Sequence, residues 1–455
     1  MLRKALVILS GNAAASLLLL ARNLIVARLI PLEDYGVAAT FALAMALVEM
    51  ASTFGLQQQI VQSKDGDDPR FQAALQGFQL LRGLIAGAVL FALAGPLARF
   101  MAVPQVIWAY QVLALVPVLT ALQHFDIHRQ TRQMRFGPLI ATGALPALAS
   151  VLVIWPLSLW FADWQIMLWS ILLQAALGTA VSHLMAERRW RLVYDRTILM
   201  GSLRFGWPLL ANAVLMFVIF QGDRLIVGRE LGMAALAVFS MGVTLTLTPT
   251  LVLAKSVQNL MLPKLSAARA DPARFQRLAA AAFQIHLIFG CALVLGAALF
   301  GPWILHLLLG AKYAALAPLL IWMAVQQALR LCKGGPSAVA VARGQTENAL
   351  VANLFRVALL PLAWWVVVRG GDMLVVVHLG ILGEGVGLIV ALLLQRVRQG
   401  VALRPLLAPL AGGALTCVTA LSWANQGPQA LIWLSGAGLC LTLALSRDLK
   451  GLRRR

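Results

Sequence analysis

Eight charged side chains lie inside long apolar segments of this sequence, where ionised groups are rare and usually functional. The basic ones are Arg22, Arg82, Arg224, Lys255 and Arg356, and the acidic ones are Glu49, Asp223 and Glu384. A basic residue at the centre of a membrane-spanning helix costs about 2.5–3.5 kcal/mol, so five of them facing lipid would cost on the order of 15 kcal/mol. We therefore expect these side chains to face a water-filled cavity or one another.

The excess of basic over acidic groups in this interior suits an anionic ligand. Arginine holds a phosphate through two parallel hydrogen bonds, and a diphosphate offers several acceptor oxygens. The residues predicted to contact such a head group are Arg22, Arg82, Lys255 and Arg356. The residues predicted to act in gating or coupling are Glu49, Asp223, Arg224 and Glu384. For Arg22 a simpler alternative is a side chain that reaches towards the outer interface.

Two further groups extend this prediction. Arg330 and Lys333 add to the positive interior if Gly334-Gly335-Pro336 breaks its helix inside the membrane, and the sequence leaves open whether it does. Arg22 and Asp223 occupy equivalent places in two halves of the chain, because Arg22 comes two residues before "LIVAR" (24–28) and Asp223 comes two residues before its repeat "LIVGR" (225–229). We predict that these two side chains approach each other when an outer gate closes.

Neutral polar residues also recur at helical spacing. Gln72, Gln76 and Gln79 fall on one helix face, and Arg82 lies at its edge. Such a face either lines a cavity or forms hydrogen bonds between helices. The sequence leaves both interpretations open.

The elements that carry these residues are predicted to be transmembrane helices. Hydrophobic residues make up 61% of the chain, charged residues 12%, and the mean hydropathy is +0.84, which excludes a soluble fold. About fourteen apolar segments are long enough to span a bilayer. They lie at residues 5–30, 35–61, 72–98, 105–125, 137–160, 164–186, 202–230, 234–259, 277–309, 313–333, 345–368, 373–396, 405–424 and 430–446. We predict an all-α integral membrane protein.

The net charge of +20 follows the positive-inside rule and does not indicate nucleic-acid binding. With the N-terminus inside, the inner connections hold 27 of the 37 basic residues. The outer connections hold Arg28, Arg99, Arg229, Lys312 and Arg369. Both termini are therefore predicted to be cytoplasmic. The first apolar segment carries Arg22 and Asn23, so we interpret it as an uncleaved span and not as a signal peptide.

A short repeat indicates how the spans are grouped. "LIVAR" at residues 24–28 recurs as "LIVGR" at residues 225–229, six spans later and in the same orientation. Two parallel six-helix lobes around a central cavity explain this spacing. The predicted domains are an N-terminal lobe (1–195), a C-terminal lobe (196–398), and a region with two additional spans and a basic tail (399–455).

Three segments carry a resemblance to a known family. They are "ARNLIVARLIPLEDYGVAA" with "TFGLQQQIVQ" in the first sixty-two residues, "SLRFGWPLLANAVLMFVIFQGDRLIVGRELG" at 202–232, and "LPKLSAARAD" at 262–271. The sequence resembles the polysaccharide-transport family of the multidrug/oligosaccharidyl-lipid/polysaccharide exporter superfamily. Fourteen spans also match the lipid II flippase.

The resemblance implies a flippase that works by alternating access in the bacterial inner membrane. Its substrate would be a polyprenyl-diphosphate-linked oligosaccharide used for cell-surface polysaccharides. The implied partners are membrane lipid, that substrate, and a polysaccharide polymerase with glycosyltransferases.

Two alternatives remain. A drug or metabolite antiporter of the same superfamily would be expected to carry acidic residues in its cavity, because its substrates are cations. A membrane glycosyltransferase or polymerase would use Glu33 and Asp34 as catalytic carboxylates, but it would also need a substantial outer loop. The sequence has no Walker-type nucleotide motif, and its four cysteines lack metal-ligand spacing. We predict a transporter and not an enzyme, with no cofactor and no metal.

Overall fold

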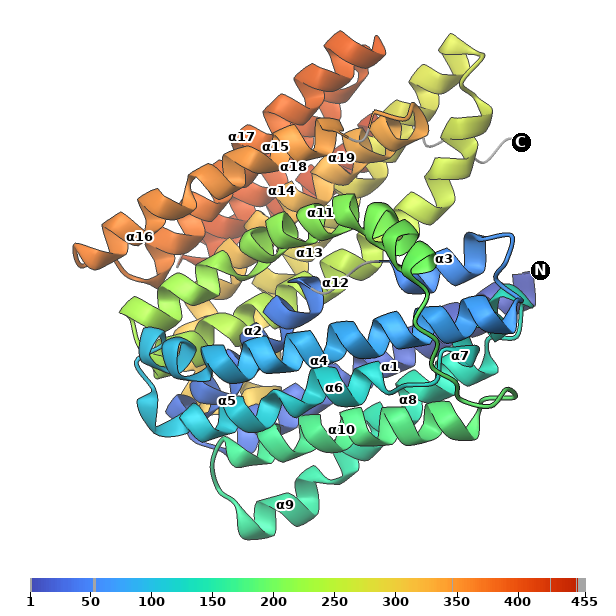
Figure 1. Cartoon of the computed structure of the whole chain (residues 1–455). Helices are drawn as coiled ribbons and strands as arrows, with labels where there is room; N and C mark the ends of the chain where they lie inside the picture. The colour runs from blue at the N-terminus through green and yellow to red at the C-terminus, as the bar shows by residue number, and fades with distance from the viewer. Residues whose placement is uncertain (1, 52–54, 346, 426, 447, 449–455) are drawn as a thin grey trace. The chain divides into compact units, whose positions relative to one another are not determined.

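The computed structural model describes residues 2–51, 55–345, 347–425, 427–446 and 448 (Figure 1). Every regular element within these residues is helical, as the composition predicts. The chain forms two compact units, unit 1 (Met1–Ala237) and unit 2 (Val238–Arg455). Each unit is described by itself below.

Unit 1 contains the helices α1 to α11 and the first turn of α12. Their bounds are α1 (Leu2–Leu29), α2 (Leu32–Ala51), α3 (Leu56–Gln62), α4 (Pro69–Phe100), η1 (Pro104–Val106), α5 (Ile107–Leu113), α6 (Leu115–Ala121), α7 (Asp126–Arg132), α8 (Gly137–Leu152), α9 (Ile154–Trp160), α10 (Gln165–Leu184) and α11 (Arg196–Glu230). Helix α6 packs against both α4 and α10, and α8 packs against α1 and α10. The three helices α4, α6 and α10 run side by side in Figure 1.

Unit 2 contains most of α12 and all later helices. Their bounds are α12 (Met233–Ala267), α13 (Pro272–Leu309), η2 (Ala311–Leu316), α14 (Ala317–Ala342), α15 (Glu347–Ala358), α16 (Leu360–Val368), α17 (Met373–Gln399), α18 (Arg404–Ala424) and α19 (Ala430–Leu445). Helix α14 packs between α13 and α17, while α18 pairs with α19 and with α13.

The membrane class predicted from the sequence is confirmed. Ten helical segments within the described residues are long and apolar enough to cross a bilayer, and α19 is a shorter apolar helix. Their outward surface carries exposed residues such as Trp155, Trp160 and Trp433, which suit a lipid environment. The count of fourteen spans stays a prediction.

Proline residues divide some of the predicted spans and leave others whole. Helix α5 ends four residues before Pro117, and α15 ends shortly before Pro361, because proline has no amide hydrogen and its ring crowds the preceding turn. Pro146 and Pro249 lie inside the continuous helices α8 and α12. The same residue type therefore interrupts only some of these helices.

The sequence left open whether Gly334-Gly335-Pro336 breaks its helix, and the structure shows that α14 continues through these residues. The two glycines serve close packing of α14 against α13. A Cβ atom on Gly334 would lie 2.5 Å from Nε2 of His286, and one on Gly335 would lie 2.8 Å from Cα of Phe283. Small residues that let two helices approach are common in membrane proteins.

Candidate functional site

A cavity of about 480 Å³ lies among α1, α2, α4, α6, α8 and α10 of unit 1. Two of the four predicted head-group residues, Arg22 and Arg82, line it together. The polar lining is completed by Thr120, Gln123, Thr142 and Gln174. The remaining lining is apolar or small, so the arginines are the charged groups of the described lining.

Arg22 is held in the cavity wall by a neutral partner. It projects from α1, is 9% exposed, and its Nη1 donates to Oε1 of Gln174 on α10 at 2.6 Å. The Nε atom of the same guanidinium has no hydrogen-bond partner within the described residues. An amide fixes the side chain without cancelling its charge, so the charge stays available to a ligand in the cavity.

Close packing of α4 against α6 places Arg82 beside the cavity. At the adjacent Gly83 a Cβ atom would lie 2.1 Å from Cβ of Ala121 and 2.8 Å from the Pro117 carbonyl oxygen. Only glycine permits this approach. The Arg82 side chain is half-buried at the edge of this contact.

No carboxylate occurs among the described lining residues of the cavity. The predicted residue Glu49 lies in α2 near Val48, which does line the cavity, but the Glu49 side chain lies outside the described residues. The described wall therefore has a positive charge, as an anion-binding site requires.

The other predicted residues of unit 1 lie on α11. Asp223 is buried, and Nη1 of the neighbouring Arg224 donates to Oε1 of Gln221 at 2.8 Å. Neither residue lines the cavity. The predicted approach of Asp223 to Arg22 stays a prediction.

The predicted residues Arg356 and Glu384 lie together in unit 2. Glu384 on α17 is fully buried and bonds Arg330 at 2.8 Å and Lys333 at 2.6 Å, while Nε of Arg356 lies 4.0 Å from its carboxylate. We call these four residues the Glu384 cluster. Three basic groups thus gather on one buried acid.

Lys255 differs from the other predicted residues because its side chain is exposed on α12. The structure thus divides the four predicted head-group residues into a pair that lines one cavity, one member of the Glu384 cluster, and one exposed lysine.

The glutamine face of α4 forms hydrogen bonds between helices, which was one of the two interpretations from sequence. Nε2 of Gln76 donates to the carbonyl of Gln123 at 3.0 Å, and Nε2 of Gln79 donates to that of Ala121 at 3.1 Å. Both glutamines are buried. They tie α4 to the end of α6.

Sequence reasoning missed Gln174, which positions Arg22. Its signal was weak: Gln174 and Gly178 share one face of the segment 164–186 at a four-residue spacing. A single amide in an apolar helix does not reveal which partner helix it will meet.

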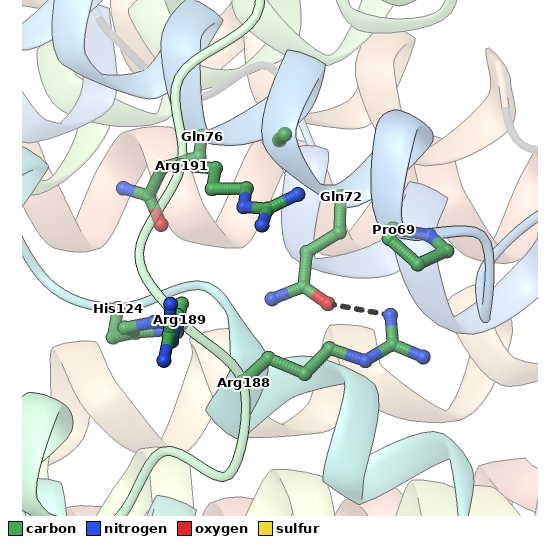
Figure 2. Close-up of a pocket in the computed structure, with 8 residues that line it drawn as sticks. Pro69, Gln72, Gln76, His124, Arg188, Arg189 and Arg191 are labelled. Atoms are coloured by element: carbon green, nitrogen blue, oxygen red, sulfur yellow. Dashed lines mark hydrogen bonds between the residues drawn. The ribbon is translucent and has the colours of Figure 1, made fainter.

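A second, smaller pocket of about 230 Å³ lies where α4 begins (Figure 2). It is lined by Pro69, Gln72, Ala73, Gln76, His124, Arg188, Arg189 and Arg191. Arg188 donates to Oε1 of Gln72 at 3.0 Å and to the Asp67 carbonyl at 2.8 Å, so it binds neutral oxygens. We call this the arginine pocket.

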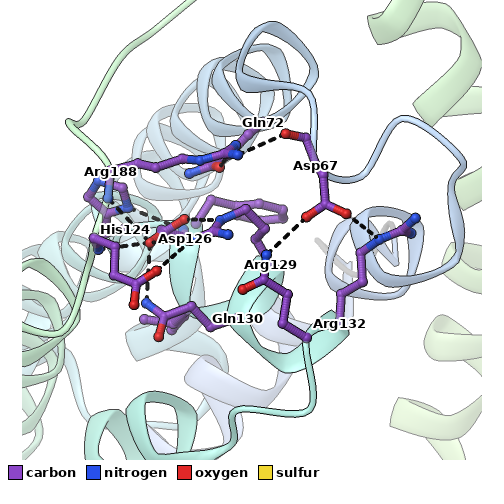
Figure 3. Close-up of polar contacts among 12 residues, drawn as sticks. Asp67, Gln72, His124, Asp126, Arg129, Gln130, Arg132 and Arg188 are labelled. Atoms are coloured by element: carbon purple, nitrogen blue, oxygen red, sulfur yellow. Dashed lines mark hydrogen bonds and ion pairs between the residues drawn. The ribbon is translucent and has the colours of Figure 1, made fainter.

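Next to it lies a charge network built on Asp126 at the start of α7 (Figure 3). Asp126 is fully buried, accepts from Nε of Arg129, and also accepts from the amide of Glu187 at 2.9 Å. Burial alone would raise the pKa of Asp126, but the Arg129 guanidinium and the Glu187 amide lower it to about 2. The exposed Glu187 carboxylate pairs with Arg129 and Arg135, which lowers its pKa as well.

Comparison with known proteins places the chain in a family. A family model described as "Polysaccharide biosynthesis protein" matches residues 25–318. The chain belongs to this family. This confirms the resemblance found in the sequence.

Two curated proteins are similar to this chain. The amylovoran biosynthesis protein AmsL of Erwinia amylovora is 23% identical over 304 residues, covering 64% of this chain and 77% of that protein. The succinoglycan biosynthesis transport protein ExoT of Rhizobium meliloti (strain 1021) is 21% identical over 315 residues, covering 67% of this chain and 62% of that protein.

Solved structures show that the fold is that of a transporter. The lipid II flippase MurJ in an inward closed conformation has a TM-score of 0.73 at 13% identity and covers 98% of both chains. An inward-facing multidrug resistance MATE family transporter of the MOP superfamily has a TM-score of 0.69 at 19% identity, covering 85% of this chain and 94% of that one. The protein is a multi-pass membrane protein with this fold.

Proposed function

We propose that this protein is a flippase that moves a polyprenyl-diphosphate-linked oligosaccharide from the inner to the outer leaflet by alternating access. The oligosaccharide would serve cell-surface polysaccharide biosynthesis. The family match and the names of the two relatives support a role in polysaccharide transport.

The observation that carries the proposal is the cavity of unit 1. Arg22 and Arg82 line it together, Gln174 holds Arg22 without neutralising it, and no described lining residue is acidic. A diphosphate in this cavity would receive charge-assisted hydrogen bonds from both guanidinium groups. These bonds would offset the loss of water around the head group as it crosses the apolar region.

Membrane placement follows the distribution of basic residues. We place the protein in the bacterial inner membrane with both termini in the cytoplasm, because 27 of the 37 basic residues then face inward. The lobes 1–195 and 196–398 would provide the two alternating halves, with residues 399–455 as an addition. A polymerase and glycosyltransferases of the same pathway would be the functional partners.

The roles of the remaining predicted residues follow from their surroundings. Lys255 is exposed and free to contact a substrate head group, while Arg356 sits within the Glu384 cluster. We assign Glu49, Asp223, Arg224 and Glu384 to gating or coupling. These assignments rest on the cost of charge inside a membrane.

The direct experiment measures the lipid-linked intermediate in a deletion strain complemented with variants. Loss of the gene should cause polyprenyl-linked oligosaccharide to accumulate in the inner leaflet, and the double variant Arg22→Gln/Arg82→Gln should fail to relieve this. Arg99→Gln is the matched control, since Arg99 is an exposed arginine on the same helix as Arg82.

The alternatives give different results in the same strains. If the deletion changes resistance to cationic drugs and leaves the intermediate unchanged, the protein is an antiporter. If chain length of the polysaccharide changes while leaflet distribution does not, the protein is a polymerase.

A further inference from the structure

The arginine pocket carries more positive charge than its surroundings cancel. Arg189 and Arg191 are exposed and make no ion pair with a described residue, and the Arg188 guanidinium donates to the neutral oxygens of the Gln72 side chain and the Asp67 backbone. The nearby acids are engaged elsewhere: Asp67 pairs with Arg132 and Asp195 pairs with Arg70. No lining residue of the pocket is acidic.

His124 adds a directed hydrogen-bond donor to this pocket. It is 3% exposed, and its Nδ1 accepts the backbone amide of Asp126 at 3.1 Å, so the neutral ring carries its proton on Nε2. That Nε2 makes no hydrogen bond within the described residues, although the backbone of Arg188 lies close enough to interact with the ring. An anion in the pocket would offer this buried donor a charged acceptor, which forms a stronger hydrogen bond than a backbone carbonyl does.

An apolar groove of about 410 Å³ adjoins the pocket along α4. It is lined by Ala74, Gly77, Phe78, Leu80, Leu81, Leu84, Leu192, Val193, Tyr194, Asp195 and Leu199. Its lining residues on α4 lie about 10 Å further along the helix than those of the pocket, at 1.5 Å per residue. Because α4 is a candidate span, the groove lies deeper in the apolar region than the charged pocket.

The same chain segment, residues 186–195, forms one wall of both sites. The amide of Val193 donates to the Ala73 carbonyl at 3.2 Å, and Arg188 holds the other part of the segment against Gln72. The pocket and the groove are thus fixed relative to each other. Leu81, Leu84 and Tyr194 leave the groove open outward, with exposed fractions of 41%, 48% and 77%.

The arginine pocket is separate from the cavity of Arg22 and Arg82. The two share no lining residue, and a hydrogen bond from the buried Gln76, which lines the pocket, to the carbonyl of Gln123, which lines the cavity, stands between them. A molecule in the pocket would therefore remain at the membrane surface. This favours a resident membrane lipid over a substrate on its way to the cavity.

We propose that the arginine pocket and the adjoining groove bind an anionic phospholipid of the leaflet on the basic side of the membrane. The phosphate lies among Arg188, Arg189 and Arg191 and accepts from Nε2 of His124, and an acyl chain lies along the groove. The lipid fastens the segment 186–195, which links α10 to α11, to α4.

The test measures lipid binding by native mass spectrometry of the full-length protein in detergent. Phosphatidylglycerol and phosphatidylcholine are added to the unaltered protein and to Arg189→Gln/Arg191→Gln. Each basic residue near an anionic head group is worth about fivefold in affinity, so the double variant should bind phosphatidylglycerol about 25-fold more weakly. Phosphatidylcholine binding should change little.

Two further variants make the test specific. Arg196→Gln/Arg204→Gln removes the same charge from exposed positions of α11 outside the pocket, and it should retain phosphatidylglycerol affinity within about twofold. His124→Asn keeps an acceptor for the Asp126 amide and removes the Nε2 donor. We expect it to weaken binding about tenfold, the value of a hydrogen bond to a charged group.

Each contrary result overturns the proposal. An equal loss of phosphatidylglycerol affinity in Arg196→Gln/Arg204→Gln would show that the lipid is attracted by the overall positive charge and not by the pocket. Displacement of phosphatidylglycerol by inorganic phosphate at equal concentration would show a site for the head group alone. Tighter binding of polyprenyl diphosphate through Arg189 and Arg191 would make the pocket a substrate site, and unchanged binding in the double variant would exclude any phosphate there.

Discussion

Two regions of this protein hold basic side chains inside apolar helices, and they differ in what balances the charge. In unit 1 the Arg22 guanidinium is held by the neutral amide of Gln174 beside a cavity of about 480 Å³. In unit 2 Arg330 and Lys333 bond directly to the fully buried Glu384. The first arrangement leaves charge and space for a ligand, whereas the second uses the charge to join α14 to α17.

The comparison teaches that a basic residue inside a membrane helix is not by itself evidence of a binding site. The partner of the basic group and the volume beside it decide whether the residue can bind a ligand. A carboxylate partner satisfies the basic group and fills the space, while an amide partner orients the group and leaves its charge exposed to the cavity.

The glycines around each region show how tightly it is built. On α17 a Cβ atom at Gly380 would lie 2.2 Å from Nε2 of Gln326, and one at Gly387 would lie 2.5 Å from the Ala352 carbonyl oxygen. Gly143, which lines the cavity in unit 1, has no atom within 4 Å of a Cβ built there. Close packing surrounds Gly380 and Gly387 beside the Glu384 cluster, whereas the cavity borders close packing at Gly83 and open space at Gly143.

The largest effect should come from Glu384→Gln. This change removes the counter-charge from a buried cluster, and breaking a buried pair in this way costs about 3–5 kcal/mol. Thermal unfolding of the purified protein should show the loss. Glu347→Gln is the matched control, because Glu347 forms an exposed pair with Arg398 and should cost about 0.5 kcal/mol.

A Glu384→Gln protein that stays stable but has lost transport would show that the carboxylate is not needed to join α14 to α17, and would leave its proposed role in gating or coupling. The Glu384 cluster would then be a functional site like the cavity in unit 1, and its carboxylate would act in coupling.

The next effect should come from Asp126→Asn, which extends the comparison to a paired arginine outside the spans. Removing the carboxylate leaves the buried Arg129 with only the exposed Glu187, so we expect a loss of about 3 kcal/mol at neutral pH. Thermal unfolding measures this, with Asp65→Asn as the exposed control. A loss below about 1 kcal/mol would show that Glu187 alone suffices.

The pH dependence of the same residue provides a separate check. The pKa of Asp126 is about 2 in the folded protein and ordinarily 3.8, so its charged form is favoured by folding. The ionised Asp126 contributes about 2 kcal/mol to the free energy of unfolding above pH 4, and this contribution is lost as the pH falls towards 2. Asp126→Asn should remove this part of the acid sensitivity, and a parallel pH profile in the variant would contradict the assignment.

Arg22→Gln should change the free energy of unfolding less than the variants above. Its main effect should be on transport. Loss of one charge-assisted contact to a diphosphate should reduce the flipping rate about tenfold, while unfolding changes by less than about 1 kcal/mol. Flipping of a fluorescent polyprenyl diphosphate in proteoliposomes measures the rate. If Arg22→Gln destabilises the protein as much as Glu384→Gln does, the two regions are alike and the comparison fails.

The smallest effect concerns coupling between Arg22 and Asp223. If the two side chains meet when an outer gate closes, Arg22→Ala and Asp223→Ala should be non-additive in transport by about 1 kcal/mol. Strictly additive single and double variants would show that the two residues act independently.

Much of the fold could be predicted from the sequence, because apolar runs of membrane length leave few structures possible. Each of the predicted segments contains helix. Arg22 and Arg82 line one cavity within unit 1, while the central cavity predicted between two lobes stays a prediction. The sequence could not decide whether glycine and proline break the helix at Gly334-Gly335-Pro336, where α14 continues. A glycine can serve either flexibility or close packing, and only the neighbouring helix distinguishes these uses.

The site could be predicted only in part for a similar reason. Helical spacing gave the face on which Gln76 and Gln79 lie, but not that both would donate to carbonyls at the end of α6. The sequence placed Glu384 inside an apolar segment without fixing that Arg330, Lys333 and Arg356 would gather on it. Contacts between residues far apart in the chain depend on helix rotation and register, which spacing along one helix does not set.

Sequence alone determined that the chain is a helical membrane protein with a costly excess of positive charge in its apolar segments. Hydropathy and charge are properties of each residue, and the bilayer acts on them directly. Tertiary structure decided which of those charges face an open cavity and which face a buried carboxylate. That choice depends on distances of a few ångströms between helices, because the electrostatic value of a charge inside a protein is set by its nearest partners.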